Sequence, residues 1–416
     1  MNHWLRCVEC GGEHPGASLI YRCGRCGGLL EVAYDYEELG DRLDHGGIRR
    51  RSLSVWRYRE LLPVNDDACI VSLGEGGTRL HRCRRLGEML GVRDLWVKME
   101  GDNPTCSFKD RGMTVGVSKA LEHRVKAVAC ASTGNTSASL AAYAAKAGLR
   151  GIVLVPSGRV ARGKLAQAVA HGAEIFQVEG NFDEALRLVM DISERSREIY
   201  LLNSINPYRI EGQKTLAFEV RDQLGRLPDL VALPVGNAGN ISALWKGFQE
   251  LKTLGLEDGA PRLVGIQAEG ASPIAEAFKQ GLDKIRPWGR PETIATAIRI
   301  GAPVSWRKAL NAVRESGGLM ETVSDREILE AQRLLARLEG LFVEPASAAP
   351  IAGIRKLLRD GVVQGDMEIL CIATGHGLKD PEIVLRNARF RRVKGDAAEI
   401  LKLLRAQRLR VKSYPG

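Results

Sequence analysis

Between Leu95 and His376 the chain alternates short apolar, β-branched runs with longer segments of helical periodicity. This alternation is typical of right-handed β-α-β crossovers, in which helices cover parallel sheets. The sequence therefore predicts an α/β fold with parallel-type sheets, whose ligands bind at the carboxyl ends of strands. The expected strands are Ala127–Ala131, Gly151–Pro156, Glu174–Glu179, Tyr200–Ser204, Leu230–Val235, Leu263–Ala268 and Glu368–Ala373, with expected helices such as Thr136–Lys146 and Asp183–Arg197 between them.

Polar, glycine-rich segments follow three of these strands. Ser132–Thr136 and Thr374–Gly377 are rich in hydroxyl and amide side chains, and Gly236–Asn240 reads G-N-A-G-N. Two glycines between a strand and a helix can form a nest of backbone N–H groups aimed at an anion. The structural alternatives are a plain left-handed turn for Gly236–Asn240, simple helix capping for Ser132–Thr136 and an ordinary turn for Thr374–Gly377.

The segment Asn103–Gly112 reads N-P-T-C-S-F-K-D-R-G and follows an apolar run that predicts a buried strand. Ser107 and Asp110 have the spacing of a capping box, which would place Lys109 in the first turn of a helix. The positive end of the helix dipole and the nearby Arg111 would both lower the pKa of Lys109. A lysine with a lowered pKa can form a Schiff base. The alternative is a surface lysine at an ordinary helix start.

An activatable lysine, a phosphate nest and polar loops at neighbouring strand ends together predict a site for pyridoxal 5'-phosphate. In this interpretation Lys109 forms the imine and Gly236–Asn240 holds the cofactor phosphate. No lysine or Walker-type Ser/Thr accompanies the nest, so the phosphate would be bound without magnesium.

Four of the nine cysteines lie in the first 26 residues as two C-x-x-C-G-G repeats. Cys7, Cys10, Cys23 and Cys26 offer four thiolates at the spacing of two metal-binding knuckles, which predicts a structural zinc ribbon. Two disulfides are the alternative, and a reducing compartment disfavours them. Because four protein ligands close the coordination sphere, the zinc would be structural and not catalytic.

The net charge of +10 comes mostly from the carboxyl-terminal tail, since residues 386–416 carry ten Lys/Arg against two acids. A helical apolar pattern at Ala397–Leu409 favours a solvated helix or a subunit contact there over a nucleic-acid-binding arm. No apolar run is long enough to span a membrane, and Met1–Cys10 lacks the apolar core of a signal peptide. We therefore expect a cytoplasmic protein without membrane contact.

Seven segments of the chain closely resemble threonine synthases, which belong to the fold type II (tryptophan-synthase-β-like) pyridoxal phosphate enzymes. They are Asn103–Gly112, Ala131–Thr136, Asn203–Val220, Pro234–Asn240, Arg290–Pro303, Glu344–Ser347 and Thr374–Asp380. S-F-K-D-R followed by G-N-A-G-N is specific to the superfamily. The block N-S-x-N-P-x-R-x-E-G-Q-K-T narrows the resemblance to threonine synthases and their near relatives. Cys106 stands where the family usually has glycine, and Arg79 where it usually has proline.

The resemblance implies roles for individual residues. Lys109 would hold the cofactor covalently and move protons, and O-phospho-L-homoserine would be the substrate, converted with water to threonine and phosphate by γ-elimination and β-addition. Cofactor contacts are implied for Phe108, Asn135 (at the phenolic oxygen), Thr374 (at the pyridine nitrogen) and the phosphate loop Gly236, Asn237, Ala238, Gly239 and Asn240. Substrate contacts are implied for Ser132, Thr136, Phe182 (near the cofactor ring), Asn203, Ser204 and Arg209.

The resulting domain organisation is a four-cysteine module at 1–35, a large domain at 36–119 and 221–385, a small domain at 120–220 and a basic tail at 386–416. The resemblance also implies a homodimer. A related enzyme, such as a cysteate synthase or a threonine dehydratase, is the nearest alternative function. A nucleic-acid-binding protein built from the cysteine module and the basic tail is a more distant alternative, because it leaves the strand-end loops unexplained.

Overall fold

The computed structural model describes residues 3–157, 162–180, 182–386, 390, 392–393, 395 and 397–408 of the chain. These residues form two compact units, Met1–Asp380 and Pro381–Gly416. None of the helices in the described part of the chain is long and apolar enough to cross a membrane.

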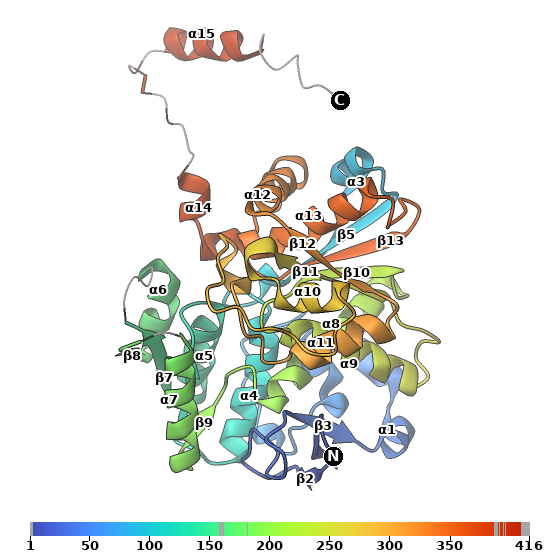
Figure 1. Cartoon of the computed structure of the whole chain (residues 1–416), viewed down its shortest axis with the longest axis vertical. Helices are drawn as coiled ribbons and strands as arrows, with labels where there is room; N and C mark the ends of the chain where they lie inside the picture. Colours follow the sequence, from blue (N-terminus) through green and yellow to red (C-terminus); the bar gives the residue numbers. More distant parts are fainter. Residues whose placement is uncertain are drawn as a thin grey trace. The chain divides into compact units, whose positions relative to one another are not determined.

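A six-stranded sheet lies in the upper part of the first unit as drawn in Figure 1. Its strands, in spatial order, are β12 (Leu319–Val323), β11 (Arg262–Ala268), β10 (Leu230–Pro234), β13 (Glu368–Ala373), β5 (Asp94–Met99) and β4 (Leu80–Arg82). All neighbours are parallel except β4 and β5. Ala373 pairs with Met99 at the carboxyl ends of β13 and β5, so the loops that follow these two strands meet.

A second, four-stranded parallel sheet has the order β8 (Glu174–Val178), β7 (Arg150–Pro156), β6 (Ala127–Ala131) and β9 (Ile199–Leu201). The predicted α/β fold with parallel-type sheets is confirmed, and each of the seven expected strands is present, with ends shifted by at most a few residues. The sequence did not predict β4 or β12. The domain boundaries at residues 35, 119, 220 and 385 stay a prediction.

Three buried helices lie at the centre of the unit: α4 (Lys109–Glu122), α8 (Pro207–Leu224) and α9 (Gly239–Thr253). Helices α4 and α8 touch through glycines. A Cβ at Gly112 would lie 2.6 Å from the carbonyl oxygen of Arg209, and one at Gly212 would lie 1.8 Å from the carbonyl oxygen of Arg111. Backbone contact at this spacing excludes any larger side chain, so it fixes the start of α4 against the start of α8.

Other helices cover the sheets. They are α3 (Arg84–Leu90), α5 (Asn135–Ala147), α6 (Arg162–Ala170), α7 (Phe182–Arg195), α10 (Pro273–Lys279), α11 (Trp306–Glu315), α12 (Asp325–Leu334) and α13 (Pro345–Arg359). Helices α5 and α7 correspond to the expected segments Thr136–Lys146 and Asp183–Arg197.

A buried network of charges joins β5, α4 and α8. Arg111 donates to Glu100 at 2.6 Å and 2.7 Å and to Glu219 at 2.9 Å, and Lys98 also donates to Glu219. Thr78 adds its backbone N–H to Glu219 at 2.9 Å. Lys98, Glu100, Arg111 and Glu219 are fully buried, with 0% of each side chain exposed. Buried charges of this kind persist only when they are paired and hydrogen-bonded, so the network links its three elements in one geometry.

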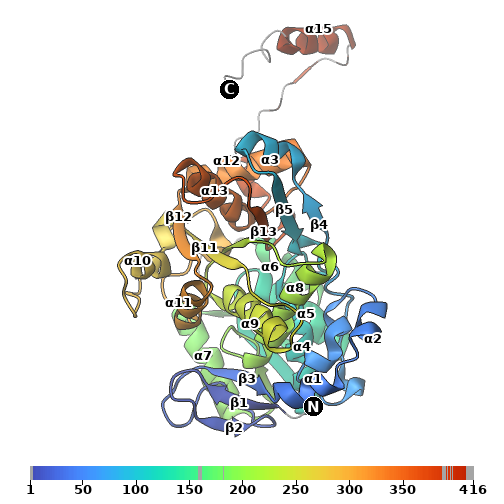
Figure 2. The ribbon, with the colours of Figure 1, turned by 90° about the vertical axis from the view of Figure 1, so that its right-hand side faces the viewer.

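The amino-terminal residues form a three-stranded antiparallel sheet, in the order β2 (Glu13–Pro15), β1 (His3–Cys7) and β3 (Leu30–Tyr34). We call residues 3–34 the cysteine module. Figures 1 and 2 both show it at the foot of the first unit, near α8 and α9. Its buried residues, such as Leu5 and Val32, belong to the same hydrophobic core as those of α8. The helices α1 (Tyr36–Arg42) and α2 (His45–Arg50) and a 3-10 turn at Val55–Leu61 follow it.

The second unit contains α14 (Glu382–Leu385) and α15 (Ala397–Arg408). Helix α15 matches the helical pattern expected at Ala397–Leu409, although Leu409 lies outside the described residues. Its Ile400, Leu401 and Leu404 are exposed. The subunit contact that the sequence favours for this tail stays a prediction.

Candidate functional site

Lys109 is the first residue of α4 and lies against the carboxyl end of β13. The backbone N–H of Phe108 donates to the carbonyl oxygen of Thr374 at 2.9 Å, and Ser107 forms an isolated bridge with Gly375. Two of the loops that the sequence singled out, Asn103–Gly112 and Thr374–Gly377, are therefore in direct contact. The parallel register of β5 and β13 is what brings them together.

The helix start differs from the predicted capping box, which was wrong. No side chain caps α4. The Asp110 carboxylate instead accepts hydrogen bonds from the backbone N–H of Thr105 at 2.7 Å, from the Thr105 hydroxyl at 2.6 Å and from the Ser139 hydroxyl at 2.5 Å. Asp110 thus fixes the loop before the helix and the neighbouring α5. The Ser107 hydroxyl is buried without a partner among the described residues.

The amine of Lys109 has a pKa lowered to about 7, mainly by burial and then by the nearby guanidinium of Arg209, while Glu344 opposes the shift. Arg111, which the sequence suggested as a cause, is engaged with Glu100 and Glu219. Within the described residues, Nζ of Lys109 has no hydrogen-bond partner, and it lies 4.0 Å from the centre of the Phe108 ring. An amine in this state is available as a nucleophile and as a base near neutral pH.

Arg209, in the first turn of α8, is a buried cation without a carboxylate partner among the described residues. Its Nη1 donates to the carbonyl oxygen of Leu202 at 3.1 Å, and its Nε is buried and unpaired. Burial lowers its pKa to about 10. A buried guanidinium costs several kcal/mol unless it is paired, so an anion at this position would be strongly favoured.

Of the other predicted substrate residues, Asn203 lies next to Leu202, whose carbonyl oxygen accepts from Arg209. Asn203 joins the end of β6, because its side chain accepts from Ala131 N–H at 2.9 Å and donates to Ala131 carbonyl oxygen at 3.0 Å. This places Asn203 and Ser204 beside Ser132, which follows Ala131. Thr136 lies in the first turn of α5. Helix α7 begins at Phe182, but the Phe182 side chain lies outside the described residues.

The loop Gly236–Asn240 leads from β10 into α9. Ala238 has φ +65°, the left-handed conformation that turns successive N–H groups the same way. A Cβ at Gly236 would lie 3.1 Å from the carbonyl oxygen of Ala297, so the turn is tightly packed from behind. Both polar atoms of the Asn240 amide are buried without a partner in the described structure. These features fit a ligand that the loop binds.

Gln213 connects this loop with the lysine. The Gln213 side chain lies between the two. A Cβ at Gly112 would be 2.7 Å from Gln213 Nε2, and a Cβ at Gly239 would be 3.8 Å from Gln213 Oε1. This Oε1 is also buried and unpaired. The starts of α4, α8 and α9 therefore converge on one place, and three unpaired polar groups face it or lie beside it: Arg209, Gln213 and Asn240.

Two residues of this region were not among the predicted site residues. Glu344, at the start of α13, accepts from the Asn135 amide at 3.1 Å and 3.2 Å, and burial raises its pKa. Ser347 lies one turn later, with its hydroxyl 3.0 Å from that of Thr374. The Pro345 that follows Glu344 marks a helix start, and Glu344–Ser347 is also one of the seven segments that carry the family resemblance, so both signals pointed to this region.

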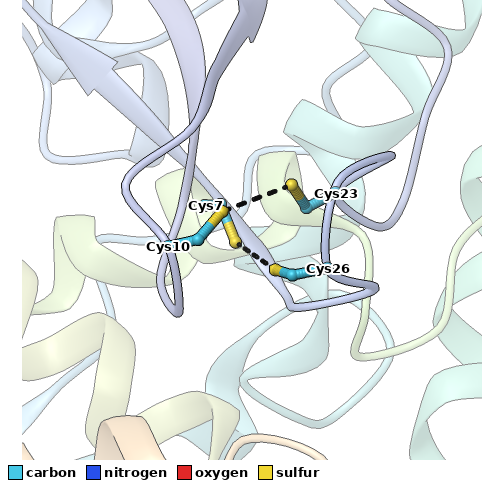
Figure 3. A group of neighbouring side chains, drawn as sticks. All are labelled: Cys7, Cys10, Cys23 and Cys26. Atoms are coloured by element: carbon cyan, nitrogen blue, oxygen red, sulfur yellow. Dashed lines mark hydrogen bonds between the residues drawn. The ribbon is translucent and has the colours of Figure 1, made fainter.

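The four cysteines of the module converge on one point (Figure 3). Their sulfur atoms all lie within 4.8 Å of one another, with Cys7 and Cys26 3.4 Å apart and Cys10 and Cys23 3.7 Å apart. All four are free cysteines, which argues against the disulfide alternative. Tetrahedral zinc thiolates have sulfur–sulfur separations of about 3.8 Å.

The two cysteine knuckles have the same backbone. Gly11 and Gly27 occupy the left-handed region, with φ +67° and +71°, and donate to the carbonyl oxygens of Cys7 and Cys23 at 3.0 Å and 2.8 Å. The backbone N–H groups of Glu9 and Arg25 each lie 3.4 Å from a cysteine sulfur. Such N–H contacts orient thiolates toward a metal and stabilise their charge.

A model of the family "Pyridoxal-phosphate dependent enzyme" matches residues 71–375. Threonine synthase of Methanocaldococcus jannaschii is 58% identical over 92% of this chain and 94% of that protein. Threonine synthase of Methanosarcina acetivorans is 56% identical over 92% and 93%, and that of Mycobacterium tuberculosis is 54% identical over 79% and 89%.

Solved structures share the fold at low sequence identity. Threonine deaminase isoform 2 from Solanum lycopersicum superposes with a TM-score of 0.65 at 20% identity, covering 89% of this chain and 96% of that one. Maize serine racemase gives a TM-score of 0.62 at 20% identity, covering 74% and 91%. At these identities the likeness concerns the fold alone.

Proposed function

The chain belongs to the pyridoxal-phosphate dependent enzymes and, among them, to the threonine synthases, and from this premise we propose that it converts O-phospho-L-homoserine and water to L-threonine and phosphate. The observation that carries the substrate assignment is the buried guanidinium of Arg209, whose Nε is unpaired, beside the Lys109 amine, whose pKa is lowered to about 7. A buried guanidinium without a carboxylate partner among the described residues favours an anionic ligand.

The residues present fit the cofactor. Lys109 supplies the amine that would hold it covalently, and the loop Gly236–Asn240 supplies a turn with a left-handed Ala238 and an unpaired Asn240 amide for its phosphate. We assign Phe108, Asn135 and Thr374 to its ring, because Phe108 directly precedes Lys109 and bonds to Thr374 after β13, and Asn135 begins α5 and bonds to Glu344 near Lys109. When bound, the cofactor withdraws electrons from the substrate and so acidifies its Cα and Cβ protons.

The hydroxyl pair Thr374–Ser347 is assigned to the pyridine nitrogen. A hydroxyl, unlike a carboxylate, leaves that nitrogen largely unprotonated, and this limits electron withdrawal by the ring and disfavours transamination. Glu344 and Asn135 hydrogen-bond each other near Lys109. We infer that the Asn135 amide turns toward the cofactor's phenolic oxygen when the cofactor is present.

The chain's own groups would then divide the work. Nζ of Lys109 would take the proton from Cα and then one from Cβ, and would return protons to Cγ and Cα, since its pKa of about 7 suits both roles. The Arg209 guanidinium holds the phosphate as it leaves Cγ, with Ser132, Thr136, Asn203 and Ser204 around it and Phe182 nearby. A planar guanidinium binds two phosphate oxygens at once, which a lysine would do with less geometric control. Water then adds at Cβ.

Product analysis tests this proposal. The purified holoenzyme is expected to release threonine and phosphate in equal amounts from O-phosphohomoserine. Formation of cysteate from phosphoserine and sulfite, or of 2-oxobutanoate from threonine, at a greater rate would instead identify one of the alternative enzymes.

In the same assay Arg209→Ala is expected to lower kcat/KM for O-phosphohomoserine by about 100-fold, the cost of losing a charged hydrogen-bond partner. The cofactor absorbance of this variant should equal that of wild type. If cofactor absorbance fell by as large a factor as kcat/KM, the assigned role of Arg209 would be refuted.

We also propose that the cysteine module holds one structural zinc ion through Cys7, Cys10, Cys23 and Cys26. Elemental analysis is expected to find one zinc per chain, lost when the two exposed ligands are replaced in a Cys10→Ser/Cys26→Ser variant. The matched control is Cys69→Ser, which removes a cysteine outside the cluster and should leave the zinc content unchanged. Zinc content that does not depend on Cys10 and Cys26 would exclude this site.

A homodimer and a cytoplasmic location stay predictions. Sedimentation of the purified enzyme would decide the first.

A further inference from the structure

Three tyrosine hydroxyls join the cysteine module to the chain around Arg209. The Tyr21 hydroxyl accepts a hydrogen bond from the backbone N–H of Leu201 at 2.7 Å. The Tyr208 hydroxyl donates to the carbonyl oxygen of Gly16, and the Tyr34 hydroxyl donates to Glu211 at 2.6 Å. Each bond has one partner in the module and the other at the end of β9 or the start of α8.

These contacts bracket the segment to which we assign the substrate phosphate. Leu201 precedes Asn203, and Tyr208 and Glu211 flank Arg209. The bond from Arg209 to the carbonyl oxygen of Leu202 closes the segment on itself. The module therefore holds the segment 203–209 at both ends. Because β9 is the edge strand of its sheet, Tyr21 supplies an acceptor that no neighbouring strand offers.

The three tyrosines that make these contacts are buried. Tyr21, Tyr34 and Tyr208 are 6%, 4% and 1% exposed. A Cβ at Gly16 would lie 2.4 Å from the carbonyl oxygen of His3, so this turn is pressed against β1 and has little room to move. Loss of a buried hydroxyl leaves its partner unsatisfied, which makes each bond costly to break.

The cysteine cluster lies at the end of the same loop. Residues 16–22 run from the end of β2 to the second knuckle, and Tyr21 lies two residues before Cys23. Gly16 and Tyr21 therefore lie in one short loop that ends at the cysteine cluster, where an isolated bridge also pairs Arg22 with Leu29. Opening the cysteine cluster would release both hydroxyl contacts at once.

We propose that the cysteine module is a positioning element for phosphate recognition, in which Tyr21 and Tyr208 hold the segment 203–209 so that Arg209 meets the leaving phosphate. This inference rests on the proposed function for its substrate, but it concerns residues outside the catalytic site. It predicts that the module tunes affinity for the anion rather than the cofactor or the chemical step.

The experiment uses the full-length holoenzyme and inorganic phosphate as the probe. Calorimetry is expected to show phosphate binding weakened about fivefold in each of Tyr21→Phe and Tyr208→Phe, the effect of one buried hydrogen bond. KM for O-phosphohomoserine should rise by a similar factor, kcat should change by less than about twofold, and cofactor absorbance should not change. The Cys10→Ser/Cys26→Ser variant should weaken phosphate binding at least as much.

The matched control is Tyr58→Phe. The Tyr58 hydroxyl is also buried and donates to the same helix, to Asp222 at 2.9 Å, but about 20 Å further along α8 than Arg209. Phosphate affinity equal to wild type in this variant supports the proposal. Unchanged affinity in both Tyr21→Phe and Tyr208→Phe, or an equal loss in Tyr58→Phe, overturns it.

Failure of the two proposals can be told apart. A wild-type enzyme that makes threonine but whose phosphate affinity does not depend on Tyr21 and Tyr208 refutes the positioning role alone. An enzyme that makes no threonine but binds phosphate in a tyrosine-dependent manner refutes the proposed function and supports the positioning role. A holoenzyme with no measurable phosphate affinity refutes the positioning role.

Discussion

Lys109→Ala is expected to yield a colourless protein whose turnover of O-phosphohomoserine falls by about 10⁴-fold, because one amine serves both as the covalent anchor and as the proton carrier. The measurement is the visible absorbance spectrum before and after borohydride, together with the threonine assay. In wild type, borohydride should fix the cofactor to the peptide that contains Lys109.

Lys379→Ala is the matched control for Lys109. Lys379 is another lysine whose pKa is lowered by burial, and it lies close enough to Glu344 to interact with that carboxylate. The Lys379→Ala variant should keep the colour of wild type. A colourless Lys379→Ala protein together with a yellow Lys109→Ala protein would reverse the assignment.

The pKa of Lys109 also predicts that cofactor uptake by the protein stripped of cofactor rises with pH and reaches half its maximum near pH 7, since the neutral amine is the nucleophile.

Glu219→Gln is expected to destabilise the protein by about 3–5 kcal/mol, because it leaves the buried cations Lys98 and Arg111 without a shared anion. For a chain of this size that corresponds to a fall in the thermal midpoint of about 3–6 °C. The comparison requires one scan rate for both proteins. Glu60→Gln is the control, since the Glu60–Arg51 pair is largely at the surface and such pairs contribute at most about 1 kcal/mol.

The dependence of the unfolding free energy on pH gives a second test of the role of Glu219. Burial alone would raise the pKa of its carboxyl, but Arg111 and Lys98 outweigh burial and hold the pKa below its ordinary value. A carboxyl with a lowered folded-state pKa stabilises the protein above its unfolded pKa, and this contribution is lost as pH falls toward the folded one. The stability difference between wild type and Glu219→Gln should therefore narrow below about pH 4. A difference that does not depend on pH would contradict the assigned charge.

The sequence predicted the parts of the fold that depend on local pattern. The runs at Ala127–Ala131 and Glu368–Ala373 are buried along their whole length, and continuous apolar runs between helices are typical of parallel strands covered on both faces. The G-N-A-G-N loop lies between strand β10 and helix α9, as its glycines indicated, and its role in phosphate binding stays a prediction. Strand β4 was missed because three edge residues carry almost no pattern.

The parts that depend on distant contacts could not be predicted. Asp110 has the spacing of a capping residue, but its carboxylate accepts hydrogen bonds from Thr105 and Ser139 instead of capping the helix. Lys98, Arg111 and Glu219 look like ordinary surface charges in the sequence, and only the tertiary fold shows that they neutralise one another in the interior. Glu344 was missed as a site residue for the same reason, since its partner Asn135 lies 209 positions earlier in the chain.

The pairing of β5 with β13 has a consequence for how the protein is made. Lys109 follows β5, yet the strand that closes over it ends at Ala373, so the two halves of the site leave the ribosome far apart in time. Long-range pairing of this kind slows folding and leaves apolar strand edges uncovered meanwhile. The reactive amine is thus enclosed only after nearly the whole of the first unit has been synthesised.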